Sequence, residues 1–415
     1  MKIKTVKTAI IGGGASGLAA AIACAEKLGK GSTVIIERQL RTGRKLLATG
    51  NGRCNITNTN LSAQHYWGDE AIIHSVLSQF SVSDSERFFG RMGIIFRSDD
   101  EGRIYPYSNQ ASTVLDSMRL KCEKLGVEEI CDFAITDIIR KNERFRIVSE
   151  TLTIDAEYVI FATGSQASPL LGANDSGYRI LDKLGIKSTP LFPSLSPVAA
   201  KERYKNLKGV RAKGKVCVLA DEKPVRQCEG EIQFTDYGIS GICVFEISRF
   251  VNEFFMLGTI EGIPYQEIKV SVDVMNGFTY YELCQYLKKC RQIFDEKKAE
   301  DILSAALNKK LSQSVARYCG LASKPCRSLT EHDIKKLAWG AKNFIFTPVI
   351  TDGYKSAQVG AGGIGSEYVF PDTLMAKKIN NLFIVGELLN VDGDCGGYNL
   401  HFAFGSALIP AKSMK

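Results

Sequence analysis

The hydrophobic pattern near the N-terminus predicts a strand, a tight turn, a helix and a second strand. Residues 8–12 are largely apolar and end in glycine, and residues 15–28 are mostly small and apolar, with Gly29 directly after them. Residues 33–36 form another short apolar run, which is typical of a buried strand. Because glycine commonly ends a helix, the helix is expected to stop at residue 28.

Later apolar runs predict how the rest of the chain is organised. Residues 158–166 and 382–385 resemble the N-terminal buried strands. Between them, 190–275 is expected to be rich in strands, because residues 268–274 alternate apolar and polar, whereas leucines in 277–340 recur at helical spacing. We therefore expect one discontinuous domain with an insertion. The expected parts are a domain of 1–190 and 350–415, an inserted β-rich domain of 191–275 and 330–349, and a helical subdomain of 276–329.

The turn between the first strand and helix carries the spacing Gly12-x-Gly14-x-x-Gly17. In this motif the first glycine permits the turn, the second lets the backbone approach a pyrophosphate, and the third allows close packing of helix and strand. Glu37 follows Gly17 by twenty residues, at the end of the second strand, where it can accept hydrogen bonds from a ribose. The complete strand–turn–helix context predicts a dinucleotide site. A ligand-free glycine turn would leave Glu37 unexplained.

Two further segments favour FAD over NAD. The 158–166 strand ends in Ala-Thr-Gly at residues 162–164, and the 382–385 strand ends in Gly386-Glu387, both of which resemble flavoprotein motifs. The pair Gly396-Gly397 then leads into a helix expected at 399–408. The N-terminus of that helix could stabilise negative charge on the reduced flavin ring.

A basic, glycine-punctuated stretch, GRKLLATGNGRCNITN, occupies residues 43–58. Its composition predicts a loop rather than a helix or strand. Arg44 and Lys45 can meet diphosphate charge, with Arg44 the better bidentate donor. Glycines 50 and 52 would let the backbone approach the flavin closely. The expected neighbours of flavin N5 and the pyrimidine edge are Asn51, Arg53, Cys54 and Asn55.

Together these stretches give the sequence a specific resemblance. GRKLLATGNGRCNITN and GELLNVDGDCGGYNLHFAFGSA carry it best, and further matching stretches run from residue 10 to residue 407. The chain resembles the bacterial BaiN/YhiN-like flavoproteins, which include aminoacetone oxidase-type proteins. The resemblance implies an α/β fold of the two-dinucleotide flavoprotein type, in which a Rossmann-like FAD-binding domain has an inserted β-barrel and a helical subdomain. Motif and resemblance together give the expected FAD-contacting residues: Gly12, Gly14, Ala15, Ser16, Gly17, Glu37, Arg38, Arg44, Lys45, Thr49, Gly50, Asn51, Gly52, Arg53, Cys54, Ile135, Thr163, Gly164, Gly386, Glu387, Gly396, Gly397, Tyr398, Asn399 and Leu400.

The resemblance also suggests the chemistry. One reading is reduction of an activated C=C bond, in a steroid-like or other enone, with NADH or NADPH as electron donor and non-covalent FAD. The alternatives are oxidation of a small amine with O2 and a flavin-bearing redox sensor without efficient turnover. His401, Tyr398 and Tyr237 are candidate proton donors. The small-molecule substrate is expected between the flavin ring and the insert.

Composition limits the remaining possibilities. None of the twelve cysteines forms a C-x-x-C pair, which disfavours zinc and common iron–sulfur sites, so no metal is expected. Scattered cysteines without a recognisable export signal predict a cytoplasmic protein, and no apolar run is long enough for a confident membrane span. The net charge of +8 and the basic stretch 201–215 admit an RNA-modifying enzyme, but a nucleic-acid partner is not favoured. A second G-x-G-x-x-G at 360–365 is not expected to form another Rossmann site, because no amphipathic helix follows it. The sequence does not predict an oligomeric state.

Overall fold

The computed structural model describes every residue of the chain except 1, 142, 151 and 351–352. Its backbone contacts define two compact units. Unit 1 comprises Met1–Phe192 and Gln358–Lys415, and unit 2 comprises Pro193–Ala357. The FAD motifs predicted from the sequence all lie in unit 1.

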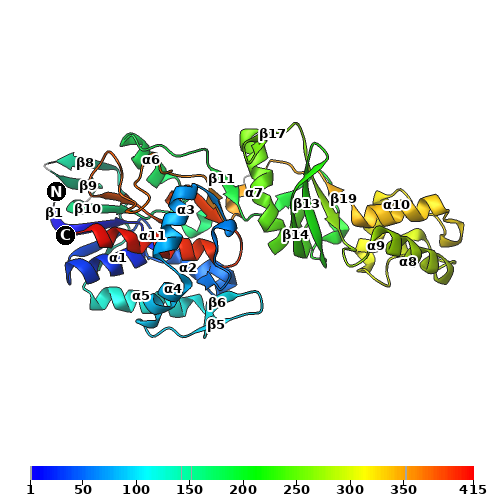
Figure 1. Ribbon diagram of the computed structural model, residues 1–415, viewed down its shortest axis with the longest axis horizontal. Coiled ribbons are helices and arrows are strands. Elements are labelled where there is room, and N and C mark those ends of the chain that lie inside the picture. The colour runs from blue at the N-terminus through cyan, green and yellow to red at the C-terminus, as the bar shows by residue number, and fades with distance from the viewer. Residues whose placement is uncertain (1, 142, 151, 351–352) are drawn as a thin grey trace. The chain divides into compact units, whose positions relative to one another are not determined.

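The centre of unit 1 is a mainly parallel sheet (Figure 1), with strands in the order β7-β2-β1-β10-β9-β8 and with β21 also paired to β10. β2, β10 and β21 run parallel to their partners, and β9 and β8 extend the sheet in antiparallel fashion. The predicted strand–helix–strand order at the N-terminus is confirmed. The strands are β1 (Lys2–Ile11), β2 (Thr33–Ile36), β7 (Glu128–Ile130), β8 (Asp137–Lys141), β9 (Arg144–Val148), β10 (Leu152–Phe161) and β21 (Leu382–Ile384).

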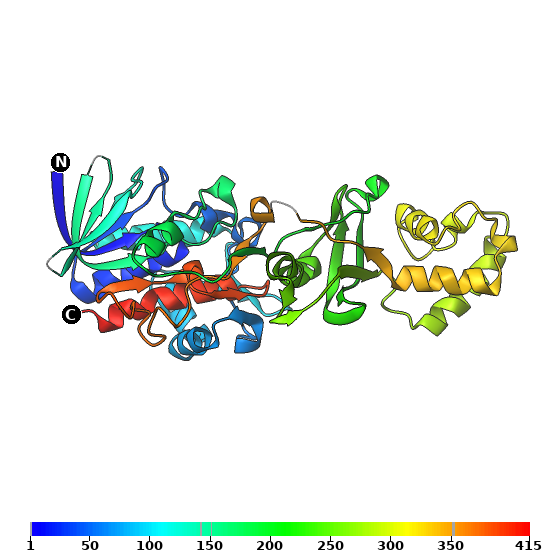
Figure 2. The same ribbon diagram turned by 90° about the horizontal axis from the view of Figure 1, so that it is seen from above.

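Two helices with glycine turns at their N-termini run side by side in unit 1 (Figures 1 and 2). They are α1 (Ala15–Leu28) and α11 (Tyr398–Ser413). Ala19, Ala20 and Ala21 of α1 are completely buried, and such small side chains permit close approach of another helix. α11 extends beyond the expected 399–408 and includes Pro410.

Unit 1 contains further α-helices and short strands. They are α2 (Arg44–Ala48), α3 (Glu70–Gln79), α4 (Val82–Gly90), α5 (Ala111–Lys124) and α6 (Ser176–Lys183), with strands β3 (Thr57–Asn58), β4 (Tyr66–Gly68), β5 (Phe96–Ser98), β6 (Arg103–Pro106), β20 (Val359–Ala361) and β22 (Val391–Gly393).

Unit 2 contains an antiparallel sheet of order β12-β15-β14-β13-β18-β19. Its two edges meet, because Lys201 N donates to Thr347 O and Val349 N donates to Ala199 O. The sheet therefore closes into a barrel-like form, as the resemblance implies. Its strands are β12 (Val198–Ala199), β13 (Arg211–Ala220), β14 (Lys223–Phe234), β15 (Gly238–Ser240), β18 (Ile268–Asp273) and β19 (Phe344–Phe346).

The helices of unit 2 differ in part from the expected pattern. α7 (Ile242–Leu257) packs on β13 and β14 within a region expected to be rich in strands. A long apolar run fits a buried helix as well as a strand, which explains this difference. α8 (Tyr280–Ile293), α9 (Lys309–Tyr318) and α10 (Glu331–Lys342) form a separate cluster (Figure 1). α10 lies in the 330–349 segment that was assigned to the β-rich part, and a capping box between Thr330 and Asp333 starts it. Among the described residues, no helix has the length and apolar character needed to cross a membrane.

Candidate dinucleotide-binding site

The glycine turn after β1 leaves one position open to a ligand. A Cβ atom on Gly12, whose φ is +102°, would lie 2.5 Å from Ala162 O, and one on Gly17 would lie 1.8 Å from Gly12 O. Packing within the protein therefore requires both glycines. A Cβ on Gly14, by contrast, would have no protein atom within 4 Å. Gly14 is thus the position at which a ligand can approach the backbone.

Helix α1 begins directly beside this open space. Its N-cap is Gly14, no side chain caps it, and its first turn holds no acidic residue. The first N–H groups of a helix have no intrahelical acceptor, and the helix dipole favours an anion there. The N–H groups of Ala15, Ser16 and Gly17 can therefore meet a pyrophosphate.

Glu37 follows β2 and is held towards the glycine turn. Its Oε2 accepts a hydrogen bond from Gly13 N, and its Oε1 accepts one from Gln39 N, each at 2.7 Å. A carboxylate can accept about four hydrogen bonds, so capacity remains for a ribose. The neighbouring Arg38 is exposed and donates to Gly172 O at 2.8 Å. The sequence motif did not predict that Gly13 and Gln39 hold Glu37, because Gly13 stands at an unspecified position of G-x-G-x-x-G and Gln39 lies outside it.

The basic stretch 43–58 is not entirely a loop, which corrects the sequence-based expectation. Residues 44–48 form the short helix α2, because Gly43 adopts a left-handed conformation before it and Leu46 is buried beneath it. The chain then reverses through residues with positive φ. These are Gly50 (+56°), Asn51 (+56°), Gly52 (+81°) and Cys54 (+60°). Asn adopts the left-handed conformation more readily than other non-glycine residues, but the conformation is unfavourable for Cys54, and backbone strain of this kind clusters at ligand sites.

The charged side chains of this stretch have partners within unit 1. Arg44 donates to Gln39 Oε1 and, at 3.2 Å, to Leu170 O. The guanidinium of Arg53 lies 4.7 Å from the ring centroid of Tyr105, a cation–π arrangement. Thr49 is the C-cap residue of α2, and its side-chain hydroxyl donates to Leu46 O.

Cys54 is completely buried, and burial raises the pKa of its thiol to about 12, with a hydrogen bond to Thr49 opposing the rise. A protonated, inaccessible thiol is a poor nucleophile. The environment therefore supports a packing role over redox chemistry.

Glu387 joins three segments that are distant in the sequence. Its Oε2 pairs with Lys45 Nζ at 2.8 Å, while its Oε1 accepts from Ser165 Oγ at 2.8 Å and from Gly360 N at 2.9 Å. Lys45 and Glu387 were expected at the diphosphate and the ribityl chain respectively, and the structure brings them together. Sequence reasoning missed Ser165 and Gly360.

The second glycine motif also finds its explanation here. No helix follows Gly360 directly, consistent with the expectation that this motif forms no Rossmann site. Instead, a Cβ on Gly362 would lie 2.1 Å from Pro190 O and one on Gly363 would lie 2.6 Å from Leu388 O. Close backbone packing beside Glu387 requires these glycines.

Two buried polar atoms in the predicted FAD segments lack a partner among the described residues. They are Thr163 Oγ1, after β10, and Asn55 Oδ1, at the end of the basic stretch. A buried polar atom without a hydrogen bond is costly, so a polar ligand that satisfied these atoms would be stabilised. Together with the open space at Gly14, these atoms fit the presence of a polar dinucleotide.

Two other residues predicted to contact FAD also lie in unit 1. Gly164 has a φ of +71°, and the half-buried Ile135 packs against the core of unit 1.

The segment before α11 comes close to the basic stretch. A Cβ on Gly397 would lie 2.5 Å from Thr57 O and 2.7 Å from Asn55 Oδ1. α11 then begins at the buried Tyr398 without a side-chain cap. Asn399 fixes the turn by accepting from Gly393 N and donating to Gly393 O. Three further predicted residues lie here: Gly386, where a Cβ would lie 2.6 Å from Ser16 Oγ, Gly396 at φ +129°, and the half-buried Leu400.

The surroundings of His401 argue against its predicted role as a proton donor. The side chain is completely buried, and burial lowers its pKa to about 4. Its Nε2 lies 2.9 Å from Phe80 O and its Nδ1 lies 2.8 Å from Thr57 Oγ1. A neutral imidazole that donates from Nε2 and accepts at Nδ1 satisfies both contacts, so a structural role fits better. Tyr237 is 39% exposed and belongs to unit 2, whereas Tyr398 and His401 belong to unit 1.

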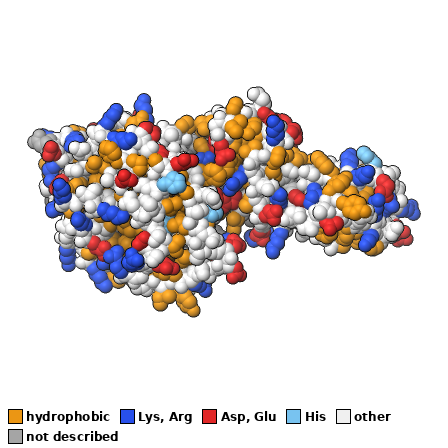
Figure 3. All heavy atoms as spheres, viewed as in Figure 1, with side chains coloured by type: hydrophobic (Ala, Val, Ile, Leu, Met, Phe, Trp, Pro, Cys, Tyr) orange, Lys and Arg blue, Asp and Glu red, His pale blue; other side chains and the backbone are white. Residues whose placement is uncertain are grey.

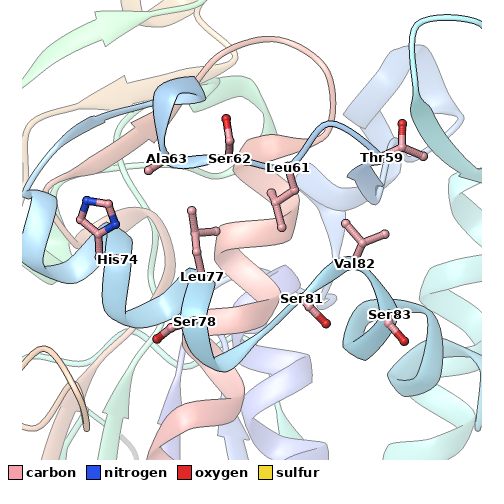
Figure 4. A pocket seen from close by; sticks show the side chains of 10 residues that line it. All are labelled: Thr59, Leu61, Ser62, Ala63, His74, Leu77, Ser78, Ser81, Val82 and Ser83. Carbon is pink, nitrogen blue, oxygen red and sulfur yellow. The ribbon is translucent and has the colours of Figure 1, made fainter.

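A surface hollow of about 550 Å³ lies elsewhere in unit 1 (Figure 4). It lies between residues 59–63 and helices α3 and α4, with Leu61, Leu77 and Val82 among its lining residues. None of the residues predicted to contact FAD lines it, so it is separate from the glycine turn.

The parallel sheet, the glycine turn and the acid after β2 define a Rossmann-type dinucleotide-binding protein. The chain belongs to the HI0933-like protein Rossmann-domain family, whose profile matches residues 6–413. The family resemblance and the α/β fold class inferred from the sequence are therefore confirmed.

Curated relatives cover nearly the whole chain. It is 34% identical over 411 residues to a 3-dehydro-bile acid delta(4,6)-reductase of Clostridium scindens, covering 97% of this chain and 98% of the relative. It is 26% identical over 413 residues to a ribosomal RNA dihydrouridine synthase of Haemophilus influenzae, covering 98% and 97%. Among solved structures, it is similar to a 3-ketosteroid-delta4-(5alpha)-dehydrogenase from Rhodococcus jostii, with 12% identity, a TM-score of 0.46, and coverage of 99% and 97%.

Proposed function

We propose that this protein is an FAD-dependent oxidoreductase that reduces a carbon–carbon double bond conjugated to a carbonyl group, with NADH or NADPH as electron donor. The observation that carries the proposal is the dinucleotide-binding turn, where Gly14 is open to a ligand and α1 begins without a cap. The predicted flavin segments around residues 45, 163, 387 and 397 belong to the same unit.

The residues of unit 1 fit FAD in a consistent order. The first turn of α1 would bind the pyrophosphate, Glu37 the adenosine ribose, and Thr163 with the Glu387 region the ribityl chain. The N-terminus of α11 would face the pyrimidine edge of the ring, where its dipole would stabilise negative charge. When bound, FAD supplies hydride from its N5 atom.

The names of two relatives point to one type of reaction. A 3-oxo steroid with 4,6 unsaturation contains double bonds conjugated to a carbonyl, and the C5=C6 bond of uracil is conjugated to its C4 carbonyl. At the steroid double bond next to the carbonyl and at the uracil bond, hydride adds to the β carbon and a proton adds to the α carbon. We propose an enone of the steroid or bile-acid class as substrate, since the relative with that name is 34% identical.

An anaerobic donor-and-acceptor panel tests this function. The purified protein should show an FAD spectrum, lose its yellow colour with NADH or NADPH, and regain it with a steroid enone. Bleaching by small amines instead would establish the oxidase, and no response to any donor would support the redox sensor. A colourless protein that binds no FAD would overturn the proposal.

A second candidate is reduction of a uracil base in RNA, which the charge of unit 2 favours. Residues 276–342 hold 13 Lys and Arg against 7 Asp and Glu. Several exposed cations of this segment form no ion pair with another described residue. They include Lys289, Lys309, Lys335 and Lys336. Figure 3 shows basic side chains beside an apolar patch on this part of the surface. Such cations can bind phosphates.

Aromatic side chains accompany this charge. A hollow of about 500 Å³ in unit 2 is lined by residues that include Lys215, Tyr280, Trp339 and Lys342. Trp339 is 48% exposed, and exposed aromatic rings beside cations are typical of single-stranded nucleic-acid sites. For this candidate, Trp339→Ala should weaken binding of a uridine-rich oligonucleotide about tenfold, whereas Tyr281→Ala, outside the hollow, should not. No salt-sensitive binding by the wild-type protein would exclude the candidate.

A further inference from the structure

We propose that His65 and Asp394 form the proton-donating pair of the reduction, an inference that rests on the proposed function. His65 lies in a segment without any motif, and neither residue was predicted as a site residue. The structure joins them at one end of the segment that carries Gly396 and Gly397.

A short strand pairing brings the two residues together. β4 pairs antiparallel with β22, with Tyr66 opposite Gly393. The next residues outward are therefore neighbours, and Asp394 N donates to His65 O at 2.9 Å. The side chains also meet, with His65 Nδ1 and Asp394 Oδ2 3.1 Å apart.

The carboxylate of Asp394 is held in place by a second donor. Its Oδ1 accepts a hydrogen bond from Trp67 Nε1 at 3.1 Å, and its side chain is only 12% exposed. A carboxylate that accepts from Nδ1 fixes the imidazole as the Nδ1–H tautomer. Asp394 is therefore the positioning residue of the pair.

The other ring nitrogen of His65 is available for proton transfer. The side chain is 34% exposed, and Nε2 has no hydrogen-bond partner among the described residues. His401 differs on both counts, because it is buried and both of its ring nitrogens have partners. Of these two histidines, only His65 can present a proton to a ligand.

His65 also contacts the segment predicted to approach the flavin ring. Its imidazole stacks on the ring of Tyr398, with centroids 4.3 Å apart and an interplanar angle of 16°. Tyr66 OH donates to Tyr398 O at 3.0 Å and holds the start of α11 in this position. Tyr398 follows Gly396 by two residues, so the stacking puts the imidazole beside the segment that is expected to face the pyrimidine edge of the flavin.

In the proposed step, Nε2 of His65 would donate its proton to the α carbon of the enone, and bound reduced FAD would supply the hydride for the β carbon. The π bond would be lost, two C–H bonds would form, and the two electrons gained by the enone would come from the reduced cofactor. The imidazole would then regain a proton from water.

Among the described residues, the titratable groups in contact with His65 include Asp394, from the loop after β22, and Tyr398, from α11. Tyr66 follows His65 in the chain and contacts Tyr398. Burial raises the pKa of Tyr66 well above its usual range, and the neighbouring Tyr398 and Asp394 add to this rise, so Tyr66 stays protonated.

The test separates the two half-reactions by stopped-flow absorbance. FAD-loaded wild type, His65→Gln and Asp394→Asn are each reduced, then mixed anaerobically with the enone. His65→Gln should slow reoxidation of the flavin about 100-fold, within the usual contribution of an acid catalyst, and leave reduction by NADH or NADPH unchanged. His74→Gln, a variant of an exposed histidine on α3, should match wild type. A wild-type protein that no enone reoxidises contradicts the proposed function, whereas normal reoxidation of His65→Gln overturns the dyad.

A second readout does not depend on turnover. Nitrogen-15 NMR of the histidine rings should show neutral His65 as the Nδ1–H tautomer, and Asp394→Asn should shift it towards Nε2–H. Imidazole in the buffer should partly restore reoxidation in His65→Gly, which a merely structural histidine would not allow. An Nε2–H tautomer in the wild type would contradict the dyad even if the His65 variants failed to fold.

Discussion

Lys45 Nζ lies 2.8 Å from Glu387 Oε2, and this ion pair links positions 342 residues apart. Both side chains are only partly exposed, at 30% and 19%. The pair ties the basic stretch after β2 to the turn after β21, so both segments keep their positions around the expected flavin. Because Glu387 also accepts from Ser165 and Gly360, it ties its own segment to three others.

Breaking this pair should weaken FAD retention. Lys45→Met removes one charged hydrogen bond, worth about 1.5–3 kcal/mol, so the Kd for FAD should rise tenfold or more. FAD occupancy after gel filtration, measured from the ratio of absorbance at 450 and 280 nm, reports the effect. The matched control is Lys208→Met, which breaks an exposed ion pair with Asp236 in unit 2. Equal FAD occupancy in both variants would contradict the assignment.

Arg44→Ala should also lower FAD occupancy, because this side chain is expected to meet diphosphate charge. Arg44→Lys keeps the charge and loses the planar fork, so its occupancy should lie between those of wild type and the alanine variant. Dialysis against buffer followed by flavin quantification distinguishes the three proteins. Unchanged occupancy in Arg44→Ala would count against the assignment.

The glycine turn offers a pair of variants with opposite expectations. Gly14→Ala should leave the free energy of unfolding unchanged within about 0.5 kcal/mol, since its Cβ meets no protein atom, but should reduce FAD binding. Gly17→Ala should destabilise the fold by about 1–3 kcal/mol, because its Cβ would clash with Gly12 O. Urea unfolding of the apo proteins and FAD titration separate these effects. Normal FAD affinity in Gly14→Ala would show that no ligand approaches this backbone.

His401 should make the fold sensitive to acid. Burial lowers its pKa from 6.5 to about 4, so the unfolded chain binds a proton that the folded chain does not. The stability contributed by neutral His401 is present above pH 6.5 and is lost as the pH falls towards 4. Between pH 7 and pH 5 the wild type should lose about 2 kcal/mol from this group.

Urea unfolding of the wild type and of His401→Gln at both pH values isolates this contribution. The variant should be less stable than wild type at pH 7, because a fully buried, doubly hydrogen-bonded ring is replaced, yet should lose less stability on acidification. A variant that loses as much stability as the wild type would show that His401 is not the titrating group.

Cys54 should resist alkylation in the native protein. Its thiol is buried and its pKa is raised to about 12, so iodoacetamide at pH 8 should leave it unmodified for hours. Mass spectrometry of peptides from the native and urea-denatured protein measures the labelling, and Cys54 should label fully only after denaturation. Rapid native labelling would revive a redox role for this residue.

Local pattern alone was enough to predict the nucleotide-binding half of the fold. The bounds of α1 and β2 match the expected 15–28 and 33–36, because apolar periodicity and the stop at Gly29 are local signals. Elsewhere the local signal was ambiguous. The apolar run of α7 fits a strand or a helix, and only its packing on β13 and β14 decides between them.

By itself, the sequence determined the family, the parallel βαβ unit, the glycine turn and Glu37, because each depends on residues close together in the chain. Only the tertiary structure decided which distant side chains meet. It paired Lys45 with Glu387 and His65 with Asp394, and it buried His401 between Thr57 and Phe80. These contacts depend on strand register and on how loops return to the sheet, which are set by packing across hundreds of residues and leave no periodic trace in the sequence.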